Sequence, residues 1–377
     1  MAWNPADTRA LHGLSISESQ RAKIAQNFAP LTPDQFLADM VFEGGGVLGT
    51  AFLGALRCCH DAGVRTADVA GTSAGAITAA LVGVGHGIDQ LEEIFSGLDY
   101  KSFLSKKTNF LILTGDPSDD MGDDIGRLIS GLVLTRQQGE YSTEPFRAWI
   151  SQRLAAIGVN RFADLPPIQR VGDAAPSRRS LKVVAADISG GIMVVLPDSL
   201  QYAPYRDEVG PDPNAYAIAD AVRLSMSIPL FFEPTKLGGN TIVDGGVTSN
   251  FPLWLFDSPP NQQPPYPTFG FRLVDKEPAP TIPGAIDVLK GLLTTVRYAH
   301  DRFYLQAKDL GRVINIDVTA ADGFQVTATK FNLSDDDKAE LYRRGYVATR
   351  NFLVDLDGKG WNWRRHLLAR GFANQHL

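Results

Sequence analysis

The chain has 377 residues, 44% of them hydrophobic, and a formal net charge of −6. This length and apolar content allow a large buried core, and we expect one elaborated domain rather than two. Because the net charge is negative, no general basic surface is expected, and this argues against a nucleic-acid-binding protein.

Residues 1–38 are predicted to form an N-terminal arm, because they are polar and mixed apart from a helical patch at 17–25. Two roles stay open for this arm, packing over the rest of the protein or regulating it. The main domain is predicted at 39–320, followed by a C-terminal helical extension at 321–377.

A glycine-rich loop at 44–49, with the sequence Gly-Gly-Gly-Val-Leu-Gly, follows a predicted strand and precedes a predicted helix. Backbone amides at such a helix start converge and favour an anion. A dinucleotide cradle shares this geometry and needs an acidic residue about twenty positions later. Asp68 is near that distance but precedes the end of its strand, so we favour an oxyanion hole. Its predicted donors are the amides of Gly44, Gly45, Gly46 and Val47.

A second motif, Gly-Thr-Ser-Ala-Gly at 71–75, lies between a predicted strand and a predicted helix of small residues. A serine on a sharp strand-to-helix turn needs small neighbours so that its hydroxyl stands clear. Gly71, Ala74 and Gly75 meet that need, which makes Ser73 the candidate nucleophile. The motif alone also fits an ordinary tight turn.

Residues 100–140 form the least regular stretch, in which apolar runs flank an acidic, glycine-dotted loop at 116–124. One hypothesis is a mobile cap over Ser73, and the alternative is an insertion packed permanently on the core. The acidic residues lack the spacing of a calcium-binding loop, so we expect no metal and no cofactor.

Strands that alternate with helices predict a three-layer α/β/α fold with a largely parallel central sheet. Further strands are expected at 181–187, 192–196, 241–243, 268–274 and 313–318, the first two as a hairpin.

The strand at 241–243 ends in Asp244-Gly245-Gly246. A carboxylate in a tight glycine turn can approach a serine hydroxyl without steric obstruction. Asp-Gly-Gly is also a common structural turn, so the motif gains weight only in combination with the other two.

The C-terminal segment mixes aromatic and basic residues, a composition that suits peripheral contact with a membrane. The alternative is a helix end with its two tryptophans packed inward. The residues concerned are Lys359, Trp361, Trp363, Arg364, Arg365 and Arg370.

The only two cysteines, Cys58 and Cys59, are adjacent in one predicted helix and poorly placed for a disulfide, which suits a reducing compartment. We recognise no leader peptide and no apolar run of bilayer length. A cytoplasmic protein is therefore expected.

Taken in order, the motifs at 44–49, 71–75 and 244–246 resemble the three blocks of the patatin-like phospholipase family. The segment 223–232 is similar to the family's segment upstream of the aspartate, and the resemblance spans about residues 40–252. It implies the patatin-like fold and a dyad, with Ser73 as the acyl-accepting nucleophile, Asp244 as its base and the glycine-loop amides as oxyanion donors. The chain departs from the family at Leu48, where an arginine is usual.

The activity that this resemblance implies is hydrolysis of ester-linked fatty acids in membrane phospholipid or lysophospholipid, at the membrane surface. Two alternatives stay open. One is an acyltransferase that uses the same serine, and the other is a non-catalytic or nucleotide-binding module at the loop 44–49. The sequence decides neither the head-group preference nor the oligomeric state.

A catalytic triad would need a histidine after the acid in chain order. Only His300, His366 and His376 follow Asp244, and none comes directly after a predicted strand in a turn of small residues. We therefore prefer the dyad and keep the triad as the alternative.

Overall fold

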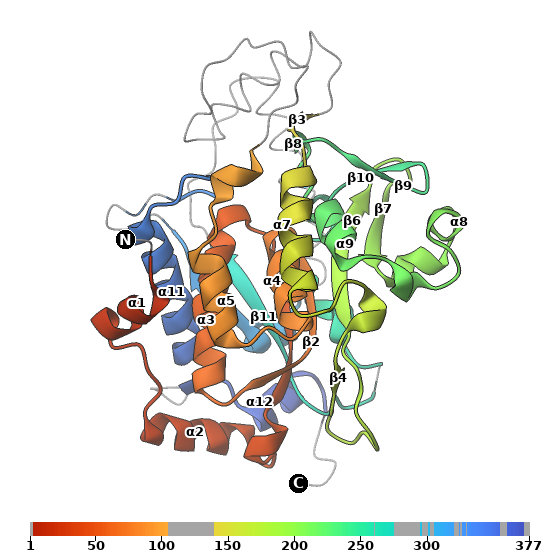
Figure 1. Ribbon diagram of the computed structural model, residues 1–377. Coiled ribbons are helices and arrows are strands. Elements are labelled where there is room, and N and C mark those ends of the chain that lie inside the picture. The colour runs from red at the N-terminus through yellow and green to blue at the C-terminus, as the bar shows by residue number, and fades with distance from the viewer. Residues whose placement is uncertain are drawn as a thin grey trace.

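The computed structural model describes residues 3–104, 139–259, 261–274, 305–319, 330–354 and 360–372, together with positions 295, 301, 324 and 326–328. In these residues the protein is an α/β fold, with helices packed on a central sheet (Figure 1). Most of the predicted cap at 100–140, including its acidic loop at 116–124, lies outside the described residues.

The central sheet contains eight of the described strands. They are β1 (Leu37–Phe42), β2 (Arg65–Thr72), β6 (Leu181–Asp187), β7 (Ile192–Leu196), β9 (Thr235–Leu237), β10 (Asn240–Asp244), β11 (Thr268–Val274) and β12 (Val313–Asp317). Their order is β12-β11-β1-β2-β6-β10-β9, with β7 paired to β6. The run from β12 to β6 is parallel, whereas β7, β9 and β10 pair antiparallel. The predicted largely parallel sheet and the hairpin of β6 and β7 are confirmed.

Helices connect these strands and cover the sheet. They include α1 (Pro5–His12), α2 (Glu18–Phe28), α3 (Thr50–Asp61), α4 (Ala74–Gly83), α5 (Ile88–Ser96), α7 (Glu144–Ala155), α8 (Tyr205–Val209), α9 (Ile218–Ser225), α11 (Asp335–Val354) and α12 (Trp363–Ala369). Two small sheets lie beside the main one, formed by β3 (Gly139–Tyr141) with β8 (Leu230–Phe232) and by β4 (Pro167–Ile168) with β5 (Ser177–Arg178).

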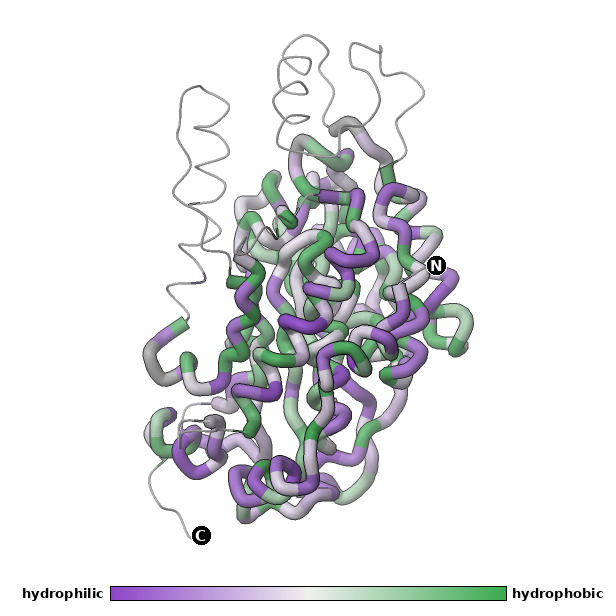
Figure 2. The backbone as a smooth tube through the Cα atoms, turned by 90° about the vertical axis from the view of Figure 1, so that its left-hand side faces the viewer, coloured by the Kyte–Doolittle hydropathy of each residue, from purple (hydrophilic) through white to green (hydrophobic). Residues whose placement is uncertain are grey.

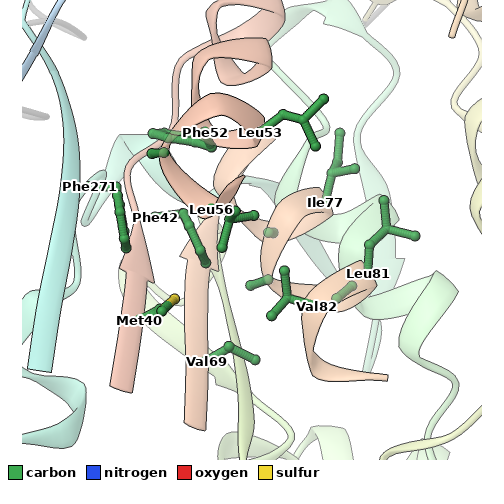
Figure 3. Close-up of a cluster of buried hydrophobic side chains, with 14 of the residues drawn as sticks. Met40, Phe42, Phe52, Leu53, Leu56, Val69, Ile77, Leu81, Val82 and Phe271 are labelled. Atoms are coloured by element: carbon green, nitrogen blue, oxygen red, sulfur yellow. The ribbon is translucent and has the colours of Figure 1, made fainter. Parts of the chain in front are cut away.

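The main hydrophobic core lies between the sheet and helices α3 and α4 (Figure 3). Strand β1 is buried along its whole length, as expected for a central parallel strand. Alternate residues of β1 and β2 face the two helices, and those between them face a smaller cluster on the other side of the sheet. The main core includes Met40, Phe42, Val69, Phe52, Leu56, Ile77, Leu81 and Phe271.

The N-terminal arm packs against the C-terminal part of the chain. Arg9 of α1 forms an ion pair with Glu92 of α5 and donates a hydrogen bond to the hydroxyl of Tyr342 on α11 at 2.9 Å. Phe28, at the end of α2, lies 4.5 Å from Trp361 between ring centroids. Helices α2 and α12 accordingly lie together at the bottom of Figure 1.

The two tryptophans of the C-terminal segment face inward. Trp361 is 4% exposed and Trp363 is 2% exposed, and Trp361 packs edge-on against Phe269 of β11 at 5.0 Å. They are therefore not available as membrane anchors, which corrects that hypothesis and confirms the inward-packed alternative. Hydrophobic and hydrophilic residues are interspersed along the tube in Figure 2. No described helix is long and apolar enough to cross a membrane.

Helices α3 and α11 pack with their backbones in contact, and two glycines permit this. A Cβ at Gly54 of α3 would overlap the carbonyl oxygen of Tyr342, and a Cβ at Gly345 of α11 would overlap the carbonyl oxygen of Ala51. Because these obstacles are backbone atoms within helices, a larger residue can be accepted only if the helices move apart.

We therefore expect Gly345→Ala to lower the free energy of unfolding by roughly 1–3 kcal/mol, as overpacking does in a closely packed core. Chemical denaturation followed by circular dichroism measures this. Gly311→Ala is the matched control, because a Cβ at Gly311 meets no atom within 4 Å. Equal stabilities of the two variants would contradict the role assigned to Gly345.

Candidate active site

The carboxyl ends of β2 and β10 meet on one edge of β6. Strand β2 pairs with residues 181–184 of β6, and β10 pairs with residues 185–187. Strand β7 pairs with residues 183–187 and must therefore occupy the opposite edge. Because β2 and β10 run in opposite directions along the shared edge, their last residues face each other.

Those last residues are Thr72 and Asp244, which pair with consecutive residues of β6. Consecutive residues in a strand are about 3.3 Å apart, so the two strand ends are neighbours. The turn after Asp244 closes the gap, because a Cβ at Gly245 would lie 3.0 Å from Cγ2 of Thr72. The sheet thus brings Ser73, the residue after Thr72, beside Asp244.

Ser73 occupies the sharp turn between β2 and α4, with φ 53° and ψ −123°. Residues other than glycine rarely adopt positive φ. A Cβ at Gly71 would overlap the carbonyl of Gly75, and a Cβ at Gly75 would overlap the carbonyl of Phe42. The packing therefore leaves no room for larger side chains at these two positions. Ser73 is 7% exposed, and its hydroxyl does not cap α4.

Asp244 is 6% exposed, and its turn orients the carboxylate. Oδ1 accepts a hydrogen bond from the amide of Gly246 at 2.7 Å. The amide of Asp244 itself donates to the carbonyl of Ser227 at 2.9 Å. A Cβ at Gly245 would overlap the carbonyl oxygen of Val184 on β6, so only glycine fits this approach.

Asn250 joins the glycine loop to the Asp244 turn, a role that the sequence analysis missed. Its side-chain NH2 group donates to the carbonyl of Gly44 at 3.0 Å and to the carboxylate of Glu43 at 3.2 Å. The backbone carbonyl of Asn250 accepts a hydrogen bond from the Gly44 amide at 3.0 Å. Its Oδ1 is 3.0 Å from the Cβ position of Gly246. Nothing in the sequence around Asn250 indicates hydrogen bonds to residues as distant in the chain as Glu43 and Gly44, so no sequence pattern could have predicted this role.

Two of the four predicted oxyanion donors are already engaged within the protein. The Gly44 amide donates to Asn250, and the Val47 amide donates to the carbonyl of Ala328 at 3.0 Å. Gly46 has φ 55°, and a Cβ there would overlap that same Ala328 carbonyl. Among the described residues no acceptor is found for the amides of Gly45 and Gly46. These two amides are therefore the remaining candidate oxyanion donors.

Asp68 is committed to structural bonds, which weakens the dinucleotide alternative. It lies within β2, and its carboxylate binds the guanidinium of Arg170 at 2.5 and 3.0 Å and accepts from the Ser180 amide at 2.6 Å. Its neighbour Asp39 is buried, and that burial raises the pKa of Asp39 well above its usual value. No side chain of this cluster is available to a ribose.

His366 lies away from Ser73, toward the amino ends of the strands. It stacks on Trp363 at 5.6 Å, and the nearby Trp361 packs on Phe269, the second residue of β11. This packing argues against a triad through His366. The other two candidates, His300 and His376, lie outside the described residues. Within the described chain no three metal-ligating side chains gather in an arrangement that could hold a metal ion.

Comparison with known proteins finds sequence matches over more than half of the chain. A family model described as "Patatin-like phospholipase" matches residues 40–257, more than half of the chain. The chain is also 34% identical over 322 residues to the Bacillus subtilis protein "Uncharacterized protein YqhO", covering 84% of this chain and 97% of that protein.

Two solved structures are similar at lower levels. VipD from Legionella pneumophila has a TM-score of 0.48 and 18% identity, with 84% of this chain and 66% of that chain covered. The type III effector protein ExoU of Pseudomonas aeruginosa has a TM-score of 0.42 and 16% identity, with 84% and 52% covered. The chain thus spans less than two thirds of either protein.

The buried position of His366 predicts a pH dependence of stability. Burial and the cations Arg312 and Arg370 lower the pKa of His366 to about 3, from an ordinary 6.5. Between these values the unfolded chain binds a proton there and the folded protein does not. The free energy of unfolding should therefore fall as the pH is lowered, by about 1.4 kcal/mol per unit from this group alone.

His366→Phe removes the titrating group and should flatten this part of the stability profile between pH 6 and pH 4. His60→Gln is the control for the loss of a histidine, because the His60 side chain is 62% exposed. Urea titrations at each pH measure the effect. A profile equally steep in His366→Phe and in the native protein would show that the buried histidine is not responsible.

Proposed function

This chain belongs to the patatin-like phospholipase family, which makes it a lipid-hydrolysing enzyme, and we propose that it releases ester-linked fatty acids through a Ser73–Asp244 dyad. The observation that carries the proposal is the meeting of β2 and β10 on one edge of β6. It supports the proposal because Ser73, the only serine with positive φ among the described residues, directly follows β2, and Asp244 is the last residue of β10.

In the proposed first step, Asp244 accepts the proton of Ser73 Oγ as that oxygen attacks the ester carbonyl carbon. The amides of Gly45 and Gly46 donate to the oxyanion that forms. The tetrahedral intermediate then collapses, the bond to the alcohol oxygen breaks, and Asp244 returns the proton to that leaving group. In the second step water attacks the acyl-serine and gives its proton to Asp244. The bond between the acyl carbon and Ser73 Oγ then breaks, Asp244 returns the proton to Ser73 Oγ, and the fatty acid is released.

The proposed substrates are membrane phospholipid and lysophospholipid, met at the membrane surface. Leu48, at the position where the family usually carries an arginine, is 4% exposed and packs in the hydrophobic core. This side chain therefore offers no cation to a lipid phosphate. Cleavage depends on the ester group and the two amides, which need no charged neighbour at this position.

Ser73→Ala should abolish ester hydrolysis while leaving the fold intact, because alanine is small enough for the turn. Asp244→Asn should remove nearly all activity, since an amide cannot accept the serine proton. Labelling by a fluorescent alkyl fluorophosphonate and fatty-acid release from phospholipid vesicles measure both. An Asp244→Asn variant that keeps most of the activity would point to a histidine base outside the described residues.

Gly46→Ala should lower kcat/KM on a soluble ester by about 10²–10³-fold, the usual loss when one oxyanion donor is displaced. Gly63→Ala is the matched control, because Gly63 also has positive φ, 80°, but a Cβ there meets no atom within 4 Å. The control should cost roughly 1 kcal/mol of stability and no activity. Full activity in Gly46→Ala would remove this loop from the proposed oxyanion hole.

A further inference from the structure

We propose that Ser225 is a positioning residue that holds the nucleophile in register with its base, an inference that rests on the proposed dyad. Ser225 is the last residue of α9 and is wholly buried. Its hydroxyl accepts a hydrogen bond from the backbone amide of Ser73 at 2.9 Å and donates one to the carbonyl of Val184 at 2.6 Å. No other described side chain binds the Ser73 backbone.

The direction of these two bonds is fixed. A serine hydroxyl has one proton, and the Val184 carbonyl can only accept, so the lone pairs of Ser225 face the Ser73 amide. The Val184 carbonyl is also the group against which Gly245 packs. The Ser225 hydroxyl therefore connects the backbone of Ser73 to the Val184 carbonyl of β6, which the turn after Asp244 also contacts.

The same short segment also holds the base. The carbonyl of Ser227, two residues after Ser225, accepts the Asp244 amide at 2.9 Å. Local bonds stiffen this segment: the Ser227 hydroxyl donates to the carbonyl of Arg223 at 2.8 Å, and the Ile228 amide donates to Met226 at 2.9 Å. Residues 225–227 thus bind the backbones of both dyad members and set the distance between them.

Ser73 needs such a support because it adopts positive φ. A conformation of this kind persists only where the surroundings over-determine it. Without the Ser225 hydroxyl, the Ser73 amide and the Val184 carbonyl would lose their partner in a buried site. Relaxation of the turn would then move Ser73 Oγ relative to Asp244.

Ser225→Ala tests this directly. We expect kcat on a soluble p-nitrophenyl ester and the rate of fluorophosphonate labelling to fall by about 10–100-fold, the loss that a displacement near 1 Å produces. KM should change by less than about threefold, since no contact with substrate is removed. Ser225→Cys retains a weak acceptor and should recover part of the lost kcat, which a purely structural effect would not predict.

Ser199→Ala is the matched control. The Ser199 hydroxyl also accepts a hydrogen bond from a backbone amide, that of Val195 at 2.9 Å, but Val195 belongs to β7 and not to the proposed site. It should lose thermal stability with kcat unchanged. If the native protein is labelled and Ser225→Ala keeps the native kcat, or if Ser225→Cys recovers none of the kcat that Ser225→Ala loses, the positioning role is wrong and the dyad stands. If the native protein is not labelled at all, the proposed function itself fails.

Discussion

The site depends on a constraint of the sheet: two strands running toward each other share one edge of β6. A continuous strand on that edge would leave no gap for a turn, and strands on opposite edges would separate the two side chains. Because the gap is narrow, the groups around it are mainly backbone groups. Glycine is required at Gly245, where a Cβ would overlap a carbonyl of β6.

The side chains that organise this gap act on backbone rather than on one another. The Asn250 side chain donates to the carbonyl of Gly44, Thr72 donates to the carbonyl of Ser249 at 2.9 Å, and Ser225 binds the Ser73 amide. Buried backbone groups need partners, and each of these side chains supplies one. The same bonds that satisfy the backbone therefore support the two residues of the proposed dyad.

Local features of the fold could be predicted from the sequence, and long-range pairings could not. The turn at Ser73 was predictable because a Cβ at Gly71 would overlap the carbonyl of Gly75, a steric reason that acts within a few residues. The partner of Asp68 was not, since Arg170 lies far along the chain and its neighbours carry no special pattern. Trp361 was ambiguous, because alternating aromatic and basic residues fit both a membrane surface and a packed interior.

The contact between Val47 and Ala328 has a consequence for how the enzyme is synthesised. The three motifs end at residue 246, and the match to the family ends at residue 257, but the carbonyl that binds the glycine loop belongs to Ala328. A nascent chain therefore carries the serine, the carboxylate and the loop before the residue that fastens the loop has been translated. A fragment that ends at residue 257 would likewise contain all three motifs and still lack the hydrogen bond between Val47 and Ala328.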